Sequence, residues 1–463
     1  MGTQAIQESH LEAFSYLSVL QCPHCGSSSL IENEPQTSID CQSCQTSFPE
    51  LSFGDVKLPF LFAEADIAAF DWCARINGFN RKVAEEIESL TTGLKSKTIS
   101  KNTRDRLKRL LQAKKHYQTQ LLTHLECFQK YQASDSLVMH TELAKNQGID
   151  SYINNIFRDW CWNNGENEEL LHAINNVIDE NFTAGVCLTL GAGASRLSYD
   201  FHHTYNADHS VLIDINPVLL GYAAKILNNQ PVVLNEFPIA PIASKDYAVE
   251  QTCQHEDLLN LDEFTLLLAD GLNAPFESKS FDTVVTPWFI DIIPTDLKEF
   301  IPHVNRLLKV GGTWVNSGSL AFFHANPQWN YSEEEVIDLL KKYGFADIKV
   351  NRTTVNYLHS PHSAHGRVEN VFSFSAIKKF DSVSAKKNDY LPSWIENPSH
   401  AIPKQAELVA ASSKYLLQAQ VLSAIDGQRS IVEIGGLLAK QYGMPEHEAV
   451  AAVRKILIDN LSV

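Results

Sequence analysis

The spacing of apolar and polar residues differs from one part of this chain to another, and it changes near residue 150. Beyond that point, short apolar runs of strand length alternate with amphipathic stretches of helix length, which predicts β-strands and α-helices in turn. The expected strands cover 185–190, 209–216, 264–271, 281–291 and 313–323, and two more lie within 348–379. Strand–helix alternation predicts an α/β fold with a doubly wound parallel sheet, whose last two strands form a hairpin-like ending.

The segments on either side of this α/β region have other patterns. Residues 63–90 and 101–131 place apolar side chains three and four positions apart, which predicts helices. A polar, proline-containing stretch has the composition of a linker, and a mostly helical pattern follows it. The expected domains are a ribbon at 1–62, a helical region at 63–149, an α/β domain at 150–380, a linker at 381–403 and a small domain at 404–463.

The composition is that of a globular protein, with 44% apolar and 20% charged residues. The formal net charge of −17 disfavours nucleic acid as a general partner, because phosphate backbones are repelled. The basic stretch 95–115 is a local exception, which a solvated helix face explains more simply. No apolar run approaches the ~18 residues of a membrane span and no export signal is recognisable, so we expect a cytoplasmic protein.

Four of the nine cysteines form two closely spaced pairs. Cys22 and Cys25 make one C-x-x-C pair, and Cys41 and Cys44 make the second. Two such knuckles can complete a tetrahedral shell of four thiolates, the arrangement of a closed structural zinc site. In a reducing compartment, metal ligation is the expected use of cysteine rather than disulfide formation. The stretch 20–61 also resembles the zinc ribbons of the methyltransferase-activator family, with CPxC, CxxC and the tail FPELSFGDVKLPFL.

The sequence LTLGAGASRLSYD, residues 188–200, runs from an expected strand through two glycines into an expected helix. Gly191 and Gly193 permit a tight turn and a close ligand approach, and the helix N-terminus supplies free N–H groups. Asp214 lies 23 residues after Gly191, at the end of the next strand, where a carboxylate can accept hydrogen bonds from ribose hydroxyls. By itself this arrangement suits NAD, FAD or S-adenosylmethionine.

Three further features favour S-adenosylmethionine. Asp270 ends the following strand, where methyltransferases commonly place an acid that contacts adenine. The hairpin-like ending of the sheet is common to class I methyltransferases. Ser195 stands where a third glycine would be expected, and a donor without a pyrophosphate does not need backbone pressed close along the whole loop.

Four linked motifs mark the α/β region. They are FRDW (157–160), LGAGASRLSYD (190–200), WFIDII (288–293) and a stretch beginning GGTWVNSGSL (311–345). Together they resemble the carnosine N-methyltransferase family, which implies a class I methyltransferase fold with a seven-stranded Rossmann-like sheet and S-adenosylmethionine as donor. The resemblance places Asn155, Arg158, Gly191, Asp214 and Asp270 at the donor and Asp291 at the acceptor. A helix N-cap is the alternative role for Asp291.

On the acceptor side the chain departs from the family pattern. His324 stands one place away from the family's Tyr-His pair, and Gly366, Arg367 and Val368 replace its tyrosines before the last strand. The acceptor therefore need not be carnosine. Because a carboxylate or a neutral histidine can act as a base, Asp291 and His324 are the candidate catalytic residues, with a merely packed side chain as the alternative for His324.

Three more histidines, His359, His362 and His365, lie in the loop HSPHSAHGR after the sixth strand, which should border the acceptor pocket. We expect them to contact the acceptor, with a plain surface loop and a metal-binding tract as alternatives. Trp288 and Trp329 are candidates for the pocket wall, although core packing is the commoner place for tryptophan.

The segment 415–461 resembles PqqD-like domains and related small winged helices, especially in LSAIDGQRSIVEI. Such domains bind a leader peptide by strand addition, and a helical packing or dimerisation domain is the alternative. The whole sequence predicts a zinc-stabilised, S-adenosylmethionine-dependent N-methyltransferase for a small imidazole- or amine-containing molecule or a peptide. A methyltransferase of RNA or translation factors and a non-catalytic donor-binding scaffold are the competing hypotheses.

Overall fold

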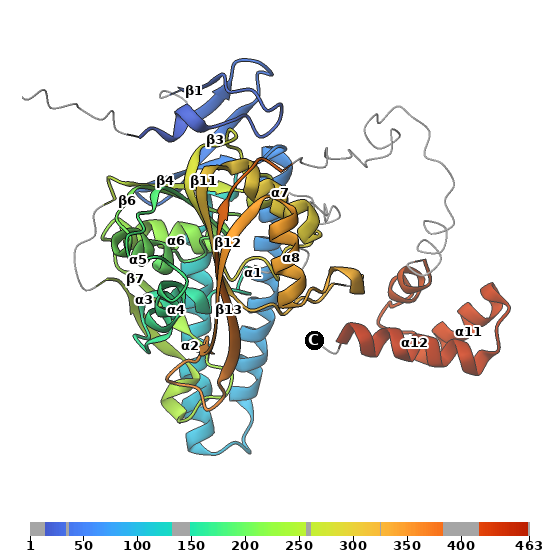
Figure 1. The fold of residues 1–463 in the computed structure, drawn as a ribbon. Coiled ribbons are helices and arrows are strands. Elements are labelled where there is room, and N and C mark those ends of the chain that lie inside the picture. Colours follow the sequence, from blue (N-terminus) through green and yellow to red (C-terminus); the bar gives the residue numbers. More distant parts are fainter. Residues whose placement is uncertain are drawn as a thin grey trace, which may run out of the picture. The chain divides into compact units, whose positions relative to one another are not determined.

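The computed structural model describes residues 14–33, 37–131, 149–255, 261–324, 326–382 and 416–461. The chain divides into two compact units, 1–385 and 386–463 (Figure 1). From residue 383 onward, the expected linker lies outside the described residues. All candidate site residues belong to the first unit.

One large sheet organises the first unit. Its strands are β1 (Leu30–Asn33), β2 (Ser38–Cys41), β3 (Ser47–Phe53), β4 (Val56–Leu61), β5 (Gly185–Leu190), β6 (Ala207–Asp214), β9 (Phe264–Ala269), β10 (Phe281–Pro287), β11 (Leu308–Gly318), β12 (Phe345–Tyr357) and β13 (Arg367–Lys378). Seven of them follow the order β9-β6-β5-β10-β11-β13-β12, in which β13 alone runs antiparallel to both neighbours. The predicted α/β fold, with its mostly parallel sheet and hairpin-like ending, is confirmed.

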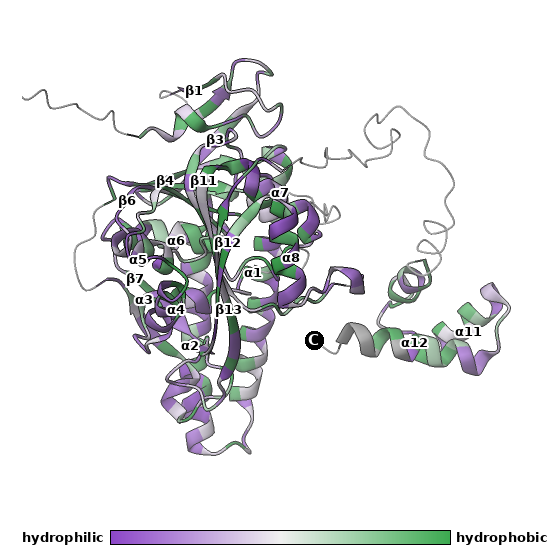
Figure 2. Cartoon of the chain, in the orientation of Figure 1, coloured by the Kyte–Doolittle hydropathy of each residue, from purple (hydrophilic) through white to green (hydrophobic). Residues whose placement is uncertain are grey.

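Helices cover both faces of this sheet. They are α1 (Ala65–Lys95), α2 (Lys101–His124), α3 (Asn154–Trp160), α4 (Glu166–Asn175), α5 (Arg196–Thr204), α6 (Pro217–Leu227), α7 (Leu297–Leu307) and α8 (Glu333–Lys342). Apolar side chains of α4 and α5, such as Ile174 and Phe201, pack with Val285 and Val315 of the sheet in one hydrophobic cluster. Figure 1 shows α4, α5 and α6 on one side of the sheet and α7 and α8 on the other. Apolar side chains of α6, α7 and α8 belong to a second, larger cluster, while the outer face of α8 is hydrophilic (Figure 2). A parallel sheet covered on both faces has central strands that are buried on both sides.

The N-terminal ribbon is continuous with the sheet. Strands β1 to β4 pair antiparallel in sequence order, and β4 then pairs in parallel with β9 through Phe60 with Leu268 and Leu61 with Ala269. The ribbon therefore extends the expected seven-stranded sheet to 11 strands. Without β4, β9 would be an exposed edge with unpaired N–H and C=O groups, so the ribbon protects the edge that carries Asp270.

Helices α1 and α2 form a hairpin that packs against α6 and β7 through α2. Part of the basic stretch 95–115 is used in these contacts. The guanidinium of Arg106 lies 4.5 Å from the ring centroid of Tyr247, and Arg109 donates a hydrogen bond to Ser244. These arginines thus hold the hairpin against the short 3-10 helix at Ser244–Tyr247.

A second, two-stranded sheet of β7 (Val232–Glu236) and β8 (Val249–Cys253) lies beside α3. Cys161, directly after α3, forms a disulfide with Cys253. The expectation that cysteines serve in metal ligation rather than in disulfides is wrong for this pair. The two cysteines are 92 residues apart in sequence, and only the packing of α3 on β8 brings their Cα atoms to 4.9 Å, a separation that a disulfide spans.

The second unit is helical in its described residues, 416–461, which contain no strand. A helix at 416–423 is followed by α11 (Ile431–Tyr442) and α12 (Glu446–Leu461). Their core contains Val421, Ile434, Leu438, Ala449 and Val453. In neither unit is any described helix both long enough and apolar enough to cross a membrane.

Candidate active site

The glycine loop follows β5 in the middle of the sheet. Gly191 and Gly193 both have left-handed backbone conformations, with φ of +72° and +56°, which glycine adopts without a steric penalty. A Cβ added to Gly191 would lie 2.3 Å from Cδ2 of Phe289, whereas one added to Gly193 would meet no atom within 4 Å. Gly191 is therefore required by packing beneath the loop, while Gly193 borders open space in which a ligand can approach the backbone.

Ser195, the residue in place of a third glycine, also has a left-handed conformation, with φ of +70°. It precedes α5, yet its side chain makes no capping hydrogen bond. Its Oγ is buried and has no hydrogen-bond partner within the described part of the chain. A side chain in this conformation is strained, so the loop retains the backbone shape of a glycine position although it carries a serine.

Two carboxylates follow the strands next to the glycine loop. Asp214 accepts hydrogen bonds from the N–H of Gly193 and the N–H of Asn216, each at 2.7 Å, and burial raises the pKa of this carboxyl. Asp270 follows β9 and accepts from the N–H of Leu272 at 2.9 Å. Because β5, β6 and β9 are parallel neighbours, the loop and both acids lie at one edge of the sheet. Each carboxylate oxygen of Asp214 keeps a lone pair for a ligand hydroxyl.

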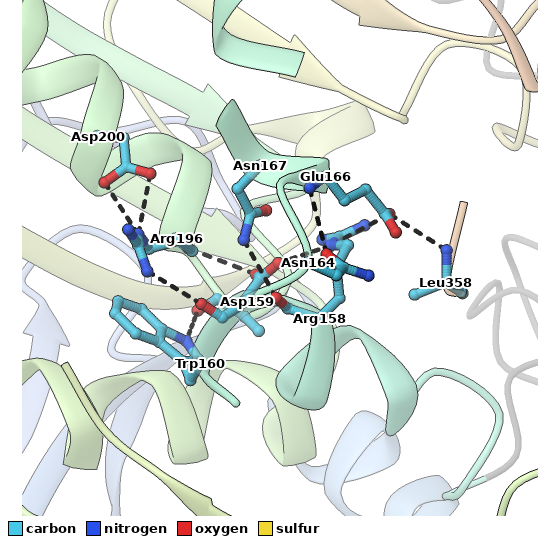
Figure 3. Close-up of polar contacts among 10 residues, drawn as sticks. Arg158, Asp159, Trp160, Asn164, Glu166, Asn167, Arg196, Asp200 and Leu358 are labelled. Carbon is cyan, nitrogen blue, oxygen red and sulfur yellow. Dashed lines mark hydrogen bonds and ion pairs between the residues drawn. The ribbon is translucent and has the colours of Figure 1, made fainter. Parts of the chain in front are cut away.

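The segment FRDW lies against the helix that follows the glycine loop (Figure 3). Trp160 donates from Nε1 to the carbonyl of Ala194 at 2.7 Å, and Asp159 accepts from the N–H of Arg196 at 3.4 Å. The guanidinium of Arg196 in turn pairs with Asp200. Asp159 and Trp160 therefore fix the start of α5, a role that the sequence motif did not assign to them.

Arg158 is held between two carboxylates rather than standing alone (Figure 3). Its Nε donates to Asp159 Oδ1 at 2.6 Å and lies 3.9 Å from Glu166 Oε1. Glu166 also accepts from the N–H of Leu358 at 3.2 Å, in the loop after β12. The chain Asp159–Arg158–Glu166–Leu358 thus connects the start of α5, after the glycine loop, to the loop that carries three of the candidate histidines. Sequence reasoning missed Glu166, because its contacts depend on residues far along the chain.

Five buried polar atoms in these segments have no hydrogen-bond partner among the described residues. They are Asn155 Oδ1, Glu166 Oε2, Ser195 Oγ, Ser198 Oγ and Trp288 Nε1. Buried polar groups are nearly always hydrogen-bonded, so atoms left unpaired around one end of a sheet indicate where a ligand supplies the partners. With the open space at Gly193 and the free lone pairs of Asp214, they fit a ligand that carries hydroxyl and amino groups, such as S-adenosylmethionine.

Asp291 lies beyond the end of β10, next to β5 in the sheet. It accepts hydrogen bonds from Ser319 Oγ at 2.6 Å and from the N–H of Ala321 at 3.3 Å, and burial raises the pKa of its carboxyl. The alternative role as a helix N-cap is wrong, because α7 is capped by Asp296, which accepts from the N–H of Lys298. Asp291 instead joins the loops that follow β10 and β11.

Trp288, the first residue after β10, has φ of +50°, a conformation that bulky residues rarely adopt. Its ring centroid lies 4.6 Å from that of Tyr357, at the end of β12. Backbone strain of this kind is typical of functional sites. Trp329, by contrast, packs against His324, with the two ring centroids 5.5 Å apart. Of the two tryptophans, Trp288 is the one near Arg158 and Glu166, because Tyr357, its ring partner, lies close to both.

His324 lies in a loop that folds on itself. Its N–H donates to Asn330 Oδ1 at 2.9 Å, and its carbonyl accepts from Asn330 Nδ2 at 3.2 Å. Its half-buried ring packs near Phe322 and makes no hydrogen bond to a described residue. The structure therefore places His324 after β11, as expected, but does not join its ring to Asp291.

The three histidines after β12 have separate surroundings. His362 Nδ1 lies 3.2 Å from Asp246 Oδ1, and the His359 carbonyl accepts from Asn164 Nδ2 at 3.1 Å. His365 is exposed. Among the described residues, only the four ribbon cysteines form a group that could hold a metal ion, so the alternative of a histidine metal tract finds no support.

The four cysteines of the ribbon converge, as predicted. Their sulfur atoms all lie within 4.8 Å of one another, and the pairs Cys22–Cys44 and Cys25–Cys41 are each 3.7 Å apart. A tetrahedral zinc ion with Zn–S bonds of about 2.3 Å has its ligands about 3.8 Å apart. The cluster is therefore compatible with a structural zinc ion whose coordination shell is closed.

Comparisons with known proteins address part of this site. Residues 234–379 match the family model described as Carnosine N-methyltransferase. A carnosine N-methyltransferase of Dictyostelium discoideum is 40% identical over 63 residues, which is 14% of this chain and 13% of that protein. Phosphoethanolamine N-methyltransferase 2 of Haemonchus contortus, solved with S-adenosyl-L-methionine, has 16% identity and a TM-score of 0.34, covering 53% of this chain and 61% of its own. The YcgJ protein of Bacillus subtilis has 11% identity and a TM-score of 0.31, covering 46% and 99%.

The chain thus spans only 13% of the length of the curated relative that it matches. The family model begins within β7 and ends just after β13. It includes Asp270, Asp291 and the four candidate histidines, but not the glycine loop or Asp214. Sequence similarity to carnosine N-methyltransferases therefore covers Asp270, Asp291 and the histidines, whereas the glycine loop and Asp214 are placed at the site by the geometry of the sheet alone.

Proposed function

We propose that this chain is an S-adenosylmethionine-dependent N-methyltransferase that acts on a small metabolite with an imidazole or amine nitrogen, or on a peptide. The observation that carries the proposal is the placement of Gly193, Asp214, Asp270 and Asp291 at or just beyond the carboxyl ends of four neighbouring parallel strands. Ligands of doubly wound sheets bind at this edge. The match of residues 234–379 to carnosine N-methyltransferases supports nitrogen as the acceptor atom.

On the donor side, we assign Asp214 to the ribose hydroxyls and Asp270 to the adenine. Asn155 and Arg158 are assigned to the methionine moiety. The unpaired Oδ1 of Asn155 supports its assignment, because it can accept from the amino group of the ligand. S-Adenosylmethionine supplies a methyl group on a sulfonium, which is the electrophile of the reaction.

On the acceptor side, the chain has to align a nitrogen lone pair with this methyl group and remove a proton. Alignment supplies much of the rate enhancement of such a displacement. We assign both tasks to Asp291, because its hydrogen bonds to Ser319 and Ala321 fix the direction of the carboxylate. Burial raises the pKa of Asp291, and a raised pKa makes a carboxylate a stronger base at neutral pH.

The histidines complete the proposed acceptor side. His324 is the second candidate base, because its ring has no hydrogen-bond partner among the described residues and lies in the loop joined to Asp291. His359 and His365 are candidate acceptor contacts. His362 is the weakest of these candidates, because Asp246 already occupies one of its ring nitrogens.

The test is methylation by the full-length chain with isotope-labelled S-adenosylmethionine. Carnosine, a set of primary amines and a small-molecule and peptide extract are the acceptors, with mass spectrometry as the readout. Label in an imidazole, an amine or a peptide nitrogen is the expected result. Label confined to RNA or a translation factor contradicts the acceptor class, and donor binding without product from any extract contradicts catalysis.

We also infer a structural role for zinc and a cytoplasmic location. The support for zinc is the closed thiol cluster, and the support for a reducing compartment is that such thiolates are preserved there. Bound zinc would hold the ribbon whose strand β4 pairs with β9, directly before Asp270. Elemental analysis of the purified chain should find about one zinc per chain.

For the second unit, we infer a PqqD-like module that binds a peptide. The support is its sequence resemblance together with exposed apolar side chains on α11, among them Val432 and Leu437. Selection from a phage-displayed peptide library against the full-length chain, repeated with the Leu437→Glu variant, tests this inference. Equal enrichment of the same peptides by both chains contradicts a peptide site on α11.

A further inference from the structure

The disulfide between Cys161 and Cys253 is attached next to the contacts that hold the glycine loop. Cys161 directly follows Trp160, whose indole donates to the carbonyl of Ala194 in that loop (Figure 3). Asp159, one residue earlier, accepts from the first N–H of α5. A restraint on Cys161 is therefore a restraint on the two residues that support the proposed donor pocket.

On its other end, the disulfide reaches the small sheet of β7 and β8. The N–H of Gln254 donates to the carbonyl of Trp160 at 3.3 Å, and Trp162 Nε1 donates to the buried Glu236 of β7 at 3.0 Å. Glu236 also accepts from Ser360, in the histidine loop after β12. The disulfide thus joins a segment beside the donor loop to a sheet that holds an acceptor-side loop.

This pair differs from the other cysteines of the chain. Four cysteines form the ribbon cluster, and Cys73, Cys127 and Cys187 are free. Within the pair, Cys253 is fully buried while Cys161 is partly exposed. Cys161 is thus the more accessible residue of the pair and the one that a small thiolate would attack, and attack at one sulfur is sufficient for thiol–disulfide exchange.

We propose that Cys161 and Cys253 form a reversible thiol–disulfide site whose oxidised state tightens the donor pocket. This inference rests on the proposed donor function of the glycine loop. In reduction, a small thiolate attacks Cys161 Sγ, the S–S bond breaks, and its electron pair passes to Cys253 Sγ, which takes up a proton. A second small thiolate then attacks the mixed disulfide, which frees Cys161 as a thiol and leaves the reductant as its disulfide. Oxidation by a small disulfide such as oxidised glutathione follows the reverse steps.

The coupling has a simple thermodynamic cause. Without the cross-link, the contact between α3 and the end of β8 rests on apolar packing and on the hydrogen bond from Gln254 to Trp160, so we expect Trp160 and Asp159 to leave the glycine loop more often. If the donor binds only to the ordered loop, its apparent Kd equals the Kd for the ordered loop divided by the fraction of molecules in which the loop is ordered. By linkage, if the disulfide raises donor affinity by some factor, donor binding must shift the thiol–disulfide equilibrium towards the disulfide by the same factor. We expect at least about fivefold, the lower end of ordinary coupling between sites.

The first measurement is peptide mapping without reduction on the full-length, zinc-loaded chain after equilibration with oxidised glutathione. Mass spectrometry should find the peptides of Cys161 and Cys253 cross-linked to each other. Recovery of both cysteines as separate alkylated peptides after this treatment overturns the proposed site, whatever the donor affinity.

The second measurement tests the coupling. The same chain is equilibrated in glutathione buffers of graded redox ratio, with and without S-adenosylhomocysteine, and the cross-linked fraction is quantified. S-Adenosylhomocysteine should shift the midpoint ratio at least about fivefold towards the disulfide, and calorimetry should give an equally lower Kd for the oxidised chain. An unshifted midpoint with equal Kd values overturns the coupling.

Variants separate the pair from the other thiols. The double variant Cys161→Ser/Cys253→Ser should bind S-adenosylhomocysteine as the reduced chain does, in both redox states. Cys127→Ser, at a free cysteine outside the pair, should behave as the unchanged chain. Loss of the affinity difference in Cys127→Ser overturns the assignment to Cys161 and Cys253. If no form binds S-adenosylhomocysteine while the cross-link is present, the proposed donor function fails instead.

Discussion

The proposed donor side and the loop after β12 on the proposed acceptor side are held together over very different sequence distances. The hydrogen bond from Gly193 to Asp214 spans 21 residues, within one strand–helix–strand unit. On the proposed acceptor side, the bonds that Asp291 accepts span 28 and 30 residues. The loop after β12 is instead held by bonds that span 192 residues, from Leu358 to Glu166, and 124 residues, from Ser360 to Glu236. The contact between Gly193 and Asp214 thus forms within one strand–helix–strand unit. The loop after β12 is instead held in place by segments that are far away in the sequence.

This difference has a practical consequence. The donor-side residues are assigned to direct contact with the donor, so changing them should alter donor affinity. Residues of the acceptor side hold loops together, so changing them should alter turnover or acceptor binding and leave donor affinity intact. Single substitutions on each side can therefore confirm or contradict the division.

The largest expected effect is on the acceptor side, at Asp291. Asp291→Asn keeps an oxygen for the hydrogen bonds from Ser319 and Ala321 but removes the charge and the base. Loss of a general base commonly costs 10²- to 10⁴-fold, so kcat should fall about 1,000-fold while the Kd for S-adenosylhomocysteine stays within about twofold. Turnover is measured with labelled methyl donor and Kd by calorimetry. Asp296→Asn, at the nearby helix cap, is the control and should keep its kcat.

The pH dependence of turnover gives a second test of Asp291. Burial raises the pKa of this carboxyl, so on acidification it gains its proton at a higher pH than an exposed aspartate with a pKa of about 3.9. Because the base must be ionised, kcat at saturating donor should fall as pH drops through this raised pKa. The same acid limb in the pH profile of the residual Asp291→Asn activity would assign it to another group.

The next effect in size is on the donor side, at Asp214. Asp214→Ala leaves the N–H groups of Gly193 and Asn216 without their charged acceptor and removes the partner of the ribose hydroxyls. Hydrogen bonds to charged groups contribute about 1.5–3 kcal/mol each, so donor affinity should fall at least about 100-fold. Calorimetry with S-adenosylhomocysteine measures the loss. Asp208→Asn, exposed on the same strand, should bind normally, and unchanged affinity in Asp214→Ala would contradict the donor assignment.

The same division explains how far the sequence could predict this molecule. Strand order, the glycine loop, Asp214 and Asp270 follow from apolar periodicity and from motifs of about 25 residues, and the structure brings them to one edge of the sheet. The zinc-type cysteine cluster follows from two short knuckles. These features are local, so their physical requirements are visible in consecutive residues.

Other features depend on contacts between distant segments and were not predictable. Three contacts have no local signal: the pairing of β4 with β9, the disulfide across 92 residues and the Glu166–Leu358 hydrogen bond. The residues next to each partner do not show which distant segment it will contact, because many segments could supply the same kind of group. The N-cap alternative for Asp291 failed for a related reason. An aspartate before a helix is a common cap, and only the structure distinguishes it from Asp296, five residues later.

A smaller effect is expected where the two sides meet, at Glu166. Glu166→Gln keeps an oxygen for the N–H of Leu358 but removes the charge opposite Arg158. Loss of one charge-assisted contact of about 1.4 kcal/mol should raise the KM for the acceptor about tenfold, with donor Kd unchanged. Steady-state kinetics and calorimetry measure the two values. Glu168→Gln, exposed on the same helix, is the control. If Glu166→Gln weakened donor binding as much as acceptor binding, the division into a donor side and an acceptor side would be contradicted.

The smallest effect concerns Ser195, the residue in the left-handed position of the donor loop. Glycine adopts φ near +70° without strain, whereas serine in this conformation costs about 1 kcal/mol of folding free energy. The gain from replacing it by glycine is smaller than this, because glycine loses more backbone entropy on folding. Ser195→Gly should therefore raise stability by less than about 1 kcal/mol, or Tm by about 2 °C, in thermal unfolding without ligand. Ser198→Gly is the matched control, because Ser198 is also buried with an unpaired Oγ but lies within α5, where glycine should lower stability by about 0.5 kcal/mol relative to serine.

Donor affinity then decides what the unpaired Oγ of Ser195 does. If this hydroxyl bonds to the donor, Ser195→Gly should gain stability yet bind S-adenosylhomocysteine about fivefold more weakly, since a neutral hydrogen bond contributes about 1 kcal/mol. Ser195→Ala, which removes the same hydroxyl but keeps the strain, should lose the same affinity without the gain in Tm. Unchanged affinity in both variants would mean that Ser195 touches no ligand, and that the donor side is held by Gly193 and Asp214 without it.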